Sequence, residues 1–232
     1  MRILVACEYS GRVRDAFIAA GHDAMSCDLL PTDAPGPHYQ GDVRDIIGDG
    51  WDLMVAHPPC TYLTCAAEWA YGDGPYHQRV KPDTLTGAAR RAARRAAIAF
   101  VQHLMDAPIP RIAIENPVGV LSSEIRKPDQ VIQPWMFGED ASKATCLWLK
   151  NLPPLTATGI IEPRLVCCGA VVHGGDKYGC PICNGAKAAR PRWGNQTDSG
   201  QNKLSPSEDR WKIRSVTYKG IAKAMQQQWG SA

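Results

Sequence analysis

The stretch "HPPC", residues 57–60, ends an apolar run and places a thiol directly after two prolines. The two prolines fix the backbone and lack N–H donors, so the turn is rigid and cannot extend a sheet. A cysteine held on such a turn can act as a nucleophile if its pKa falls or if an acid activates the substrate. A buried cysteine with a packing role is the commoner arrangement, and it stays open here. Cys60 is therefore a candidate nucleophile.

A second polar group follows another apolar run, in "IENP" at residues 114–117. A carboxylate at the dry end of a sheet is expected to have a raised pKa, so Glu115 could donate a proton at neutral pH. Asn116 could support the same site or cap a helix. A thiol and an acid on adjacent strand ends suit addition of the sulfur to an electron-poor ring whose nitrogen the acid holds.

These residues need a sheet to position them. Apolar runs at 3–9, 23–30, 39–46, 51–57 and 111–116 predict strands, and helical periodicity predicts helices over 12–22, 85–107 and 217–229. We expect Val13, Phe17 and Ile18 to face inward in the first helix, and Ile221, Met225 and Trp229 in the last.

Strands that alternate with helices indicate a doubly wound sheet, which binds ligands at the carboxyl ends of its strands. Asp28, Asp42, Cys60 and Glu115 all lie at such ends. From about residue 151 the chain becomes rich in Gly, Pro, Asn and Ser. We therefore divide it into a catalytic domain (1–150), a small Cys-rich recognition insert (151–212) and a returning C-terminal helix (213–232).

"HPPC" followed by "ENP", each after an apolar strand, resembles the Pro-Cys and Glu-Asn-Val motifs of DNA cytosine-5 methyltransferases. The segment "CEYSGRVRDAF" near the start and the segment "GIAKAM…QW" near the end resemble the short phage-type members of that family. The resemblance covers residues 1–150 and the last helix. It implies an α/β, Rossmann-like class I methyltransferase fold that uses S-adenosylmethionine. The insert lies largely outside the resemblance, and we expect it to be small, irregular and stabilised by zinc.

The resemblance also implies roles for individual residues. Cys60 would attack C6 of a flipped cytosine, Glu115 would hold N3 and the exocyclic amine, and Asn116 would support the turn. The cofactor residues would be Glu8, Ser10, Gly11, Asp28, Asp42 and Pro58, with Asp28 on the ribose and Asp42 on the adenine amine. Substrate contacts would come from Tyr62, Lys143, Thr145 and Arg192.

The sequence departs from the family at several positions. The first loop, "EYSGRVR", has one glycine, and Arg12 and Arg14 stand where small residues usually approach the cofactor. Thr61 and Pro117 replace a Gln and a Val, and "SKATCLWL" stands where a Gln-x-Arg-x-Arg motif is usual. "HPPC" also resembles the Asp-Pro-Pro-Tyr motif of amino-methyltransferases, less closely because His57 and Cys60 replace the acid and the aromatic residue.

Four of the nine cysteines lie within residues 167–183. Cys180 and Cys183 form a Cys-x-x-Cys knuckle of the kind that binds zinc, and Cys167 and Cys168 could complete a tetrahedral site. His173 could replace one of them, and four unligated thiols are the alternative. A structural Zn²⁺ is the prediction, because the glycine-rich insert has little else to stabilise it.

The formal net charge of +3 permits a nucleic-acid partner but does not require one. DNA is the expected partner. The basic segment after the knuckle, with Arg192 and Trp193, suits phosphate contact and stacking. Arg90, Arg91, Arg94 and Arg95 form a basic helical stripe that should point outward, either onto DNA or into solvent. Residues 61–84 are expected to form a mobile lid.

No run is long enough for a membrane span, and the first residues carry no secretory signal, so we expect a cytoplasmic monomer without membrane contact. Two alternatives to DNA methylation stay open. One is a C5-modifying enzyme that acts on free deoxycytidine nucleotides. The other is a non-catalytic DNA-binding module on a methyltransferase fold.

Overall fold

The computed structural model describes residues 1–77, 79–168, 170–172 and 189–231. Its centre is a seven-stranded sheet in the order β3-β2-β1-β4-β5-β7-β6. Neighbouring strands from β3 to β5 are parallel, and β7 runs antiparallel to both of its neighbours. The strands are β1 (Arg2–Ala6), β2 (Asp23–Asp28), β3 (His38–Gln40), β4 (Leu53–Ala56), β5 (Arg111–Pro117), β6 (Gln130–Ile132) and β7 (Thr145–Lys150). This is the expected Rossmann-like methyltransferase fold.

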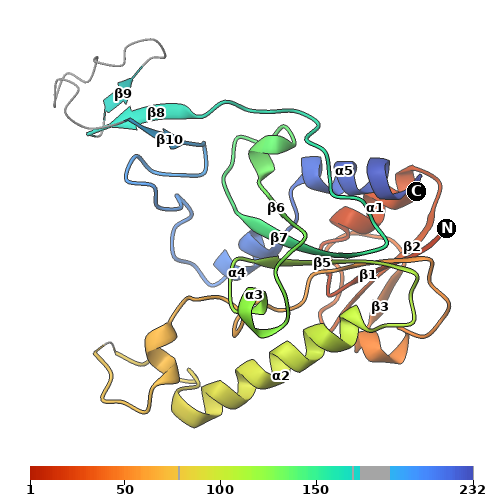
Figure 1. Ribbon diagram of the computed structural model, residues 1–232, viewed down its shortest axis with the longest axis horizontal. Coiled ribbons are helices and arrows are strands. Elements are labelled where there is room, and N and C mark those ends of the chain that lie inside the picture. Colours follow the sequence, from red (N-terminus) through yellow and green to blue (C-terminus); the bar gives the residue numbers. More distant parts are fainter. Residues whose placement is uncertain (78, 169, 173–188, 232) are drawn as a thin grey trace.

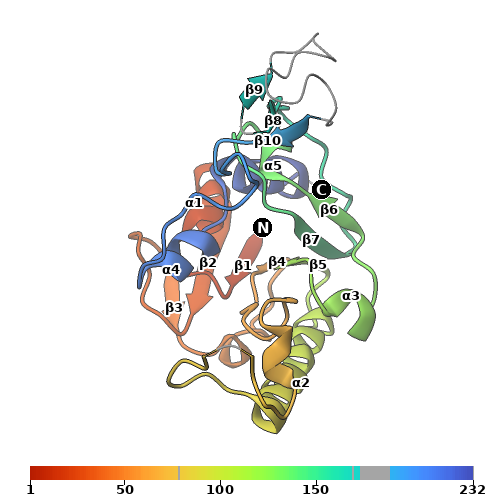
Figure 2. The same cartoon turned by 90° about the vertical axis from the view of Figure 1, so that its left-hand side faces the viewer.

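Helices cover both faces of the sheet (Figures 1 and 2). On one face, α1 (Arg12–Ala19) packs against α5 (Lys219–Trp229), and their apolar side chains share a core with β1. On the other face, α2 (Gly87–Met105) and the short α3 (Leu121–Glu124) close a second core. Ile221, Met225 and Trp229 are buried as predicted. Ile18 is exposed, so its predicted inward position is wrong, because α1 faces the sheet through Val13 and Phe17.

The strand β7 was missing from the sequence prediction. Its sequence "TCLWLK" was interpreted only as a substitute for a family motif, whereas the strand lies in the sheet between β5 and β6. The first four residues of β7 are all buried, as in β4, so its apolar run was a strand signal of the same kind. The antiparallel insertion matters for function because it carries Lys143 and Thr145 to the end of β5, where Thr145 pairs with Pro117.

The insert is more regular than predicted. Its described part contains a three-stranded antiparallel sheet of β8 (Arg164–Cys167), β9 (Ala170–Val172) and β10 (Arg190–Arg192). This small sheet extends away from the main sheet (Figures 1 and 2). The returning chain is fastened by stacking of Trp193 on Trp135, with centroids 5.6 Å apart, and by two 2.9 Å hydrogen bonds between Asn195 and Ser142.

The predicted zinc ligands fall partly outside the described residues. Cys180 and Cys183, and the alternative ligand His173, lie there, so zinc stays a prediction. The Sγ atoms of Cys167 and Cys168 are 3.8 Å apart. Within the described ranges, no group of three or more His, Cys, Asp or Glu side chains is arranged to hold a metal ion.

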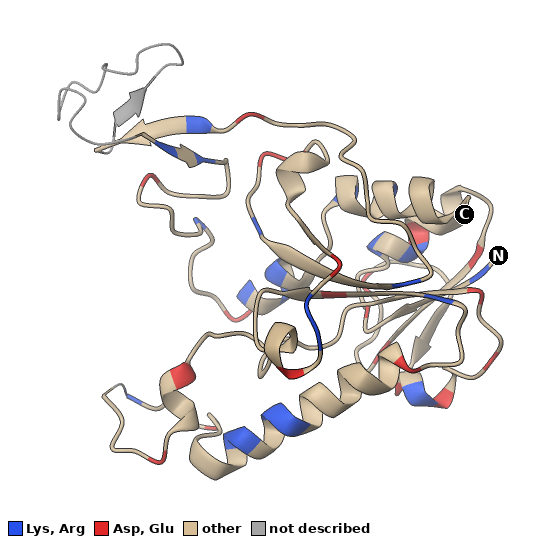
Figure 3. Ribbon diagram, viewed as in Figure 1, with Lys and Arg blue, Asp and Glu red and all other residues tan. Residues whose placement is uncertain are grey.

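The basic stripe on α2 does not point wholly outward. Figure 3 shows the arginines along the first half of this helix. Arg90 is buried, and the Arg94 guanidinium lies 3.5 Å from the centre of the Tyr71 ring and pairs with Glu68 at 2.6 Å. These two arginines therefore hold the one-turn helix η2 (Glu68–Tyr71) against α2. Because their guanidinium groups are engaged in these contacts, they are not free to contact DNA.

Three further short helices complete the described chain: η1 (Val43–Asp45), η3 (Pro134–Met136) and α4 (Arg210–Ser215). A search for membrane spans among the helices of the described residues finds none with the required length and apolarity.

Candidate active site

The site is built on the ends of β4 and β5. The parallel register pairs Ala56 with Ile114, so the next residues of the two strands, His57 and Glu115, lie side by side. Their side chains are 10% and 12% exposed, and His57 Nδ1 lies 2.6 Å from Glu115 Oε2. A short hydrogen bond between two largely buried ionisable groups makes them titrate as one unit.

The pKa of Glu115 differs from the raised value that the sequence predicted for this carboxyl group alone. Burial would raise the pKa of Glu115, but the hydrogen bond and charge of His57, with help from Lys143, lower it below its ordinary 4.5. Burial would likewise lower the pKa of His57, whereas Glu115, and more weakly Glu8, raise it above 6.5. The prediction of a raised carboxyl pKa is therefore wrong, because it left out the histidine.

The turn that carries Cys60 is held by backbone contacts. The Asn116 side chain donates from Nδ2 to the Pro58 carbonyl at 2.8 Å. The amides of Leu63 and Thr64 both donate to the Cys60 carbonyl, at 3.0 and 3.2 Å. Asn116 thus lies where it can support the turn, as the resemblance implied. Cys60 begins a tight turn whose backbone is fixed by these hydrogen bonds.

The segment after Cys60 is also bound to the segment after Glu115. Thr64 and Gly119 form an antiparallel bridge, and the Val120 amide donates to the Leu63 carbonyl at 2.8 Å. A Cβ atom on Gly119 would lie 2.0 Å from that carbonyl oxygen. Only glycine permits this approach, so the two halves of the site are locked together at Gly119.

The Cys60 side chain is half-buried, and burial raises the pKa of its thiol. The positive charges of Lys143 and Arg214 act in the opposite direction, and Glu115 acts with burial. The thiol is therefore protonated at neutral pH in the free protein. Lys143 donates from Nζ to the Arg214 carbonyl at 2.9 Å, which holds this cation beside the site.

Thr145, another predicted substrate contact, is buried, and its hydroxyl donates to the Lys143 carbonyl at 3.1 Å. Tyr62 is partly buried, with the Arg90 guanidinium 5.4 Å from its ring centre. Arg192 donates to the carbonyls of Asp198 and Pro191 and lies in the small sheet. Lys143 and Thr145 are thus beside Cys60 and Glu115, whereas Arg192 is tied to its own loop.

A pocket of about 200 Å³ lies along the same edge of the sheet, at the ends of β1, β2 and β3. Asp28 and Asp42 line it, as predicted for cofactor contacts. Burial raises the pKa of Asp28, whose Oδ1 accepts from the Leu30 amide at 2.9 Å. Hydrogen bonds from Arg44 lower the pKa of Asp42 to about 2. The rest of the lining is mostly apolar or small and was not predicted: Cys7, Cys27, Leu29, Gly41, Val43, Arg44, Pro59 and Phe100.

This set of side chains fits the nucleoside half of S-adenosylmethionine. Two carboxylates supply acceptors for ribose hydroxyls and for an exocyclic amine, and Leu29, Val43 and Phe100 supply apolar contact area for a flat ring. The Asp42 carboxylate already accepts from Arg44 but keeps acceptor capacity, since two oxygens offer about four lone-pair sites.

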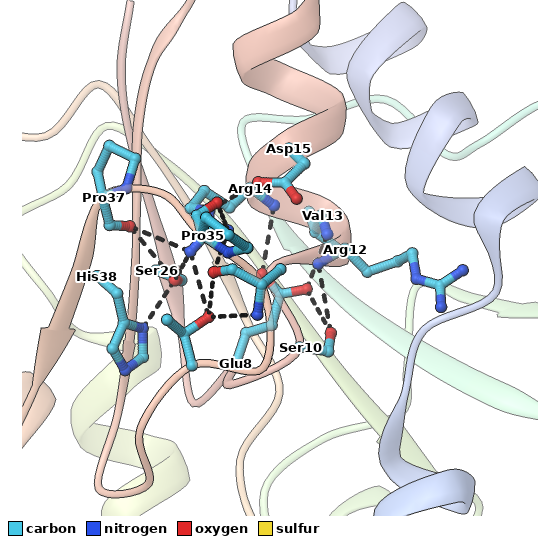
Figure 4. Close-up of polar contacts among 12 residues, drawn as sticks. Glu8, Ser10, Arg12, Val13, Arg14, Asp15, Ser26, Pro35, Pro37 and His38 are labelled. Atoms are coloured by element: carbon cyan, nitrogen blue, oxygen red, sulfur yellow. Dashed lines mark hydrogen bonds and ion pairs between the residues drawn. The ribbon is translucent and has the colours of Figure 1, made fainter.

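The loop between β1 and α1 is organised differently from the prediction. Glu8 is buried, and its carboxylate accepts from the Val13 and Arg14 amides at 2.7 and 3.2 Å and from the Ser10 hydroxyl at 3.1 Å (Figure 4). It satisfies the first free amides of α1, as an N-terminal acid should. Glu8, Ser10, Gly11 and Pro58 do not line the described pocket. Their assignment to the cofactor stays a prediction.

Arg14 explains the departure from the glycine-rich loop. Its side chain is fully buried, and its guanidinium donates to the Ser26 hydroxyl and to the carbonyls of Ala34 and Pro35, each at 3.1 Å (Figure 4). A Cβ on Gly11 would lie 2.4 Å from Arg14 Nη2. The guanidinium therefore fills the space beside the loop and holds the β2–β3 connection without entering the pocket.

A second, basic groove of about 570 Å³ opens beside the site. Its cations are Lys143, Lys203 and Arg214, its amides are Asn195, Gln196 and Asn202, and no carboxylate lines it. Lys143 and Arg214 also act electrostatically on Cys60, which places the groove next to the thiol. Sequence alone could not find it, because its walls come from three distant segments.

No protein-family model matches the sequence, and no curated protein matches it. Among solved structures, the chain is similar to an E. coli prophage-encoded protein assigned as a DNA modification methyltransferase (14% identity, TM-score 0.42). It is also similar to a mutant of Spodoptera frugiperda DNMT2 (16% identity, TM-score 0.39). Each match covers 69% of this chain and 52% or 54% of the other, so the chain spans about half the length of those proteins. Similarity at this level does not assign an activity.

Proposed function

We propose that this protein is a DNA cytosine-5 methyltransferase in which Cys60 adds to C6 of a flipped cytosine. The observation that carries the proposal is the arrangement at the ends of β4 and β5. A half-buried thiol on a locked turn lies beside an acid pair that can hold the ring nitrogen. Addition at C6 makes C5 nucleophilic, which is the chemistry that C5 methylation needs.

The pocket at the ends of β1, β2 and β3 supports the choice of cofactor. S-adenosylmethionine, when bound, supplies the methyl group. Asp28 and Asp42 would hold the ribose and the adenine amine, and the apolar lining would exclude water from the ring. Pro59 belongs to this lining and directly precedes Cys60, so the pocket borders the nucleophile.

The basic groove supports a nucleic-acid substrate over an isolated nucleotide. Lys143, Lys203 and Arg214 can neutralise several phosphates, and the amide side chains of Gln196 and Asn202 can bond to base edges. A mononucleotide would need only one such contact. The groove borders the thiol, so a strand lying in it could direct one base toward Cys60.

The test is mass spectrometry of nucleosides from duplex DNA incubated with the protein and isotopically labelled S-adenosylmethionine. We expect labelled 5-methylcytosine from DNA at a yield at least tenfold above that from deoxycytidine monophosphate. Cys60→Ser should abolish the product, because a hydroxyl is a far weaker nucleophile. Cofactor affinity, measured by calorimetry, should stay within twofold in this variant.

Three outcomes would contradict the proposal. Labelled N4-methylcytosine or N6-methyladenine would show amino-methylation, in which no covalent thiol step is needed. Equal labelling of the mononucleotide would show that the substrate is a free nucleotide. Absence of cofactor binding would leave the fold as a DNA-binding module.

A further inference from the structure

His57 hydrogen-bonds to Glu115 and belongs to neither the Pro-Cys nor the Glu-Asn-Val motif that the sequence resembles. We propose that His57 supplies the proton that Glu115 delivers to the cytosine N3, so that the two residues act as one general acid. This inference rests on the proposed function and assigns His57 as a further functional residue of that site.

The geometry is set by the backbone. His57 follows β4 directly, with its amide bonded to the Ala6 carbonyl at 2.9 Å, and Pro58 prevents any continuation of the strand. Glu115 lies within β5 at the neighbouring position. The Nδ1–Oε2 distance of 2.6 Å is typical of a charge-assisted hydrogen bond. The contact therefore follows from strand register and is not a chance surface pairing.

The pair shares one exchangeable proton, because an Nδ1–Oε2 contact of 2.6 Å requires a hydrogen between the two atoms. The pKa of Glu115 is lowered and that of His57 is raised, which favours the carboxylate as the ionised partner and the imidazole as the one that holds the proton. The titratable groups that face the pair are Glu8 from the β1–α1 loop, Lys143 from the segment before β7, and the thiols of Cys146 on β7 and Cys60. An ionised Glu115 has no proton of its own to give to a ring nitrogen, and the nearest source is His57 Nδ1.

The other ring nitrogen keeps this proton transferable. His57 Nε2 is buried and has no hydrogen-bond partner among the described residues. An unpaired buried N–H is more costly on a charged imidazolium than on a neutral ring. Passing the Nδ1 proton to Glu115 leaves the neutral Nε2–H tautomer, so the unpaired N–H remains but the charge that makes it most costly is removed. The two forms of the pair are thereby brought close in free energy.

The proposed step balances in protons and electrons. The Cys60 thiol loses its proton to solvent, which its half-exposed position permits, and the Sγ–C6 bond forms. The C5=C6 electron pair moves to C5–C4, and the C4=N3 pair moves onto N3, which takes the proton from Glu115. His57 Nδ1 refills Glu115. C5 then takes up an electrophile, which in the exchange reaction is a proton from solvent, and the C4=N3 bond re-forms. A base removes the other C5 hydrogen as a proton, the thiolate leaves as C5=C6 re-forms, and the N3 proton returns to the pair.

The step can be measured without cofactor, because the adduct at C6 lets C5 exchange its hydrogen with solvent. The assay is tritium release from DNA containing [5-³H]cytosine. We expect release by the wild type and none by Cys60→Ser. His57→Gln keeps a hydrogen-bond donor to Glu115 but cannot supply the proton, so release should be about 100-fold slower at pH 7.5.

The pH dependence separates proton supply from mere positioning. In His57→Gln, Glu115 must take its proton from solvent, so the ratio of wild-type to variant rates should shrink as pH falls from 7.5 to 5.5. Affinity for DNA should change less than threefold. The matched control is His22→Gln, at the opposite end of the sheet, which should release tritium at the wild-type rate.

Two results would overturn the inference: a variant rate within threefold of wild type, or a rate ratio that does not change with pH. Absence of release by the wild type would instead count against the proposed function. His57 can still be tested in that case by NMR titration of its ring nitrogens. Its pKa should lie above 6.5 in the wild type and below 6.5 in Glu115→Gln, and a value below 6.5 in the wild type would refute the shared proton.

Discussion

The two halves of the functional edge are built by different means. On the base side, at the ends of β4 and β5, the geometry is set chiefly by a main-chain contact, the Gly119 approach to Leu63, with one side-chain bond from Asn116 to the Pro58 carbonyl. On the cofactor side, one buried side chain, Arg14, holds three separate segments together. Backbone contacts tolerate almost no change in shape, whereas a guanidinium can be replaced with partial loss. The two halves should therefore fail differently when mutated.

The largest effect is expected from Gly119→Ala. The new Cβ would lie 2.0 Å from the Leu63 carbonyl oxygen, and two main-chain segments cannot separate without moving Cys60 away from Glu115. We expect tritium release to fall by more than 100-fold and stability to fall by about 2–4 kcal/mol. Urea unfolding and the exchange assay would measure the two changes.

Gly48→Ala is the matched control, because a Cβ there has no heavy atom within 4 Å. It should change neither quantity. Wild-type exchange by Gly119→Ala would mean that the bridge between Thr64 and Gly119 does not position the nucleophile.

On the cofactor side, Arg14→Lys should have a large but selective effect. A lysine keeps the charge but cannot reach the several acceptors that the planar guanidinium bonds. The β2–β3 connection should loosen, and with it the pocket beside Asp28. We expect cofactor affinity to fall by about 10- to 100-fold in calorimetry, with cofactor-independent tritium release within threefold of wild type.

Arg12→Lys serves as its control, because the Arg12 guanidinium extends away from this cluster (Figure 4). If Arg14→Lys lost cofactor affinity and tritium release to the same extent, the base side and the cofactor side would not be independent, which would contradict the comparison.

The sequence was sufficient to predict the parallel strands and the residues at their carboxyl ends, because both depend only on the order of elements along the chain. Apolar runs located the five parallel strands, and the residues that follow them, Asp28, Asp42, Cys60 and Glu115, all lie on one edge. Two features were inaccessible to pattern reasoning. The pairing of His57 with Glu115 depends on the β4–β5 register, and nothing in a single sequence fixes a register between strands 58 residues apart.

Arg14 was misread for a related reason. Charged residues are rarely fully buried, so an arginine in a loop motif suggested interference with the cofactor. The acceptors that permit its burial lie about 20 residues later, in a segment without regular structure. The error in the predicted pKa of Glu115 could have been avoided, because a histidine at the end of a continuous apolar strand is itself an unusual signal.

The base side also predicts a pH-dependent contribution to stability. The raised pKa of His57 stabilises the fold below pH 6.5 and loses this effect as pH rises through the folded pKa. The lowered pKa of Glu115 stabilises the fold above pH 4.5 and loses it as pH falls through the folded pKa. The coupling between the residues should therefore be greatest between pH 4.5 and 6.5, at about 1–3 kcal/mol.

A double-mutant cycle of His57→Gln, Glu115→Gln and the double variant, followed by urea unfolding at several pH values, measures this coupling. The corresponding cycle on the cofactor side, with Asp42 and Arg44, should show a much smaller coupling, because the Arg44 side chain is largely exposed. A coupling between His57 and Glu115 that does not vary from pH 5 to 9 would contradict the ion pair.

The smallest effect is expected from a substitution in the basic groove, next to the base side, and it concerns the affinity for DNA. Lys203 is exposed and makes no described salt bridge, so Lys203→Gln should leave the fold intact. If its ammonium contacts a phosphate, DNA affinity should fall by about 3- to 10-fold at low salt, and the slope of log affinity against log salt should flatten by about 1. Lys223→Gln, on α5 across the sheet, should change neither value. An unaltered salt slope in Lys203→Gln would mean that DNA leaves the site by another path, and that the base side ends at Lys143.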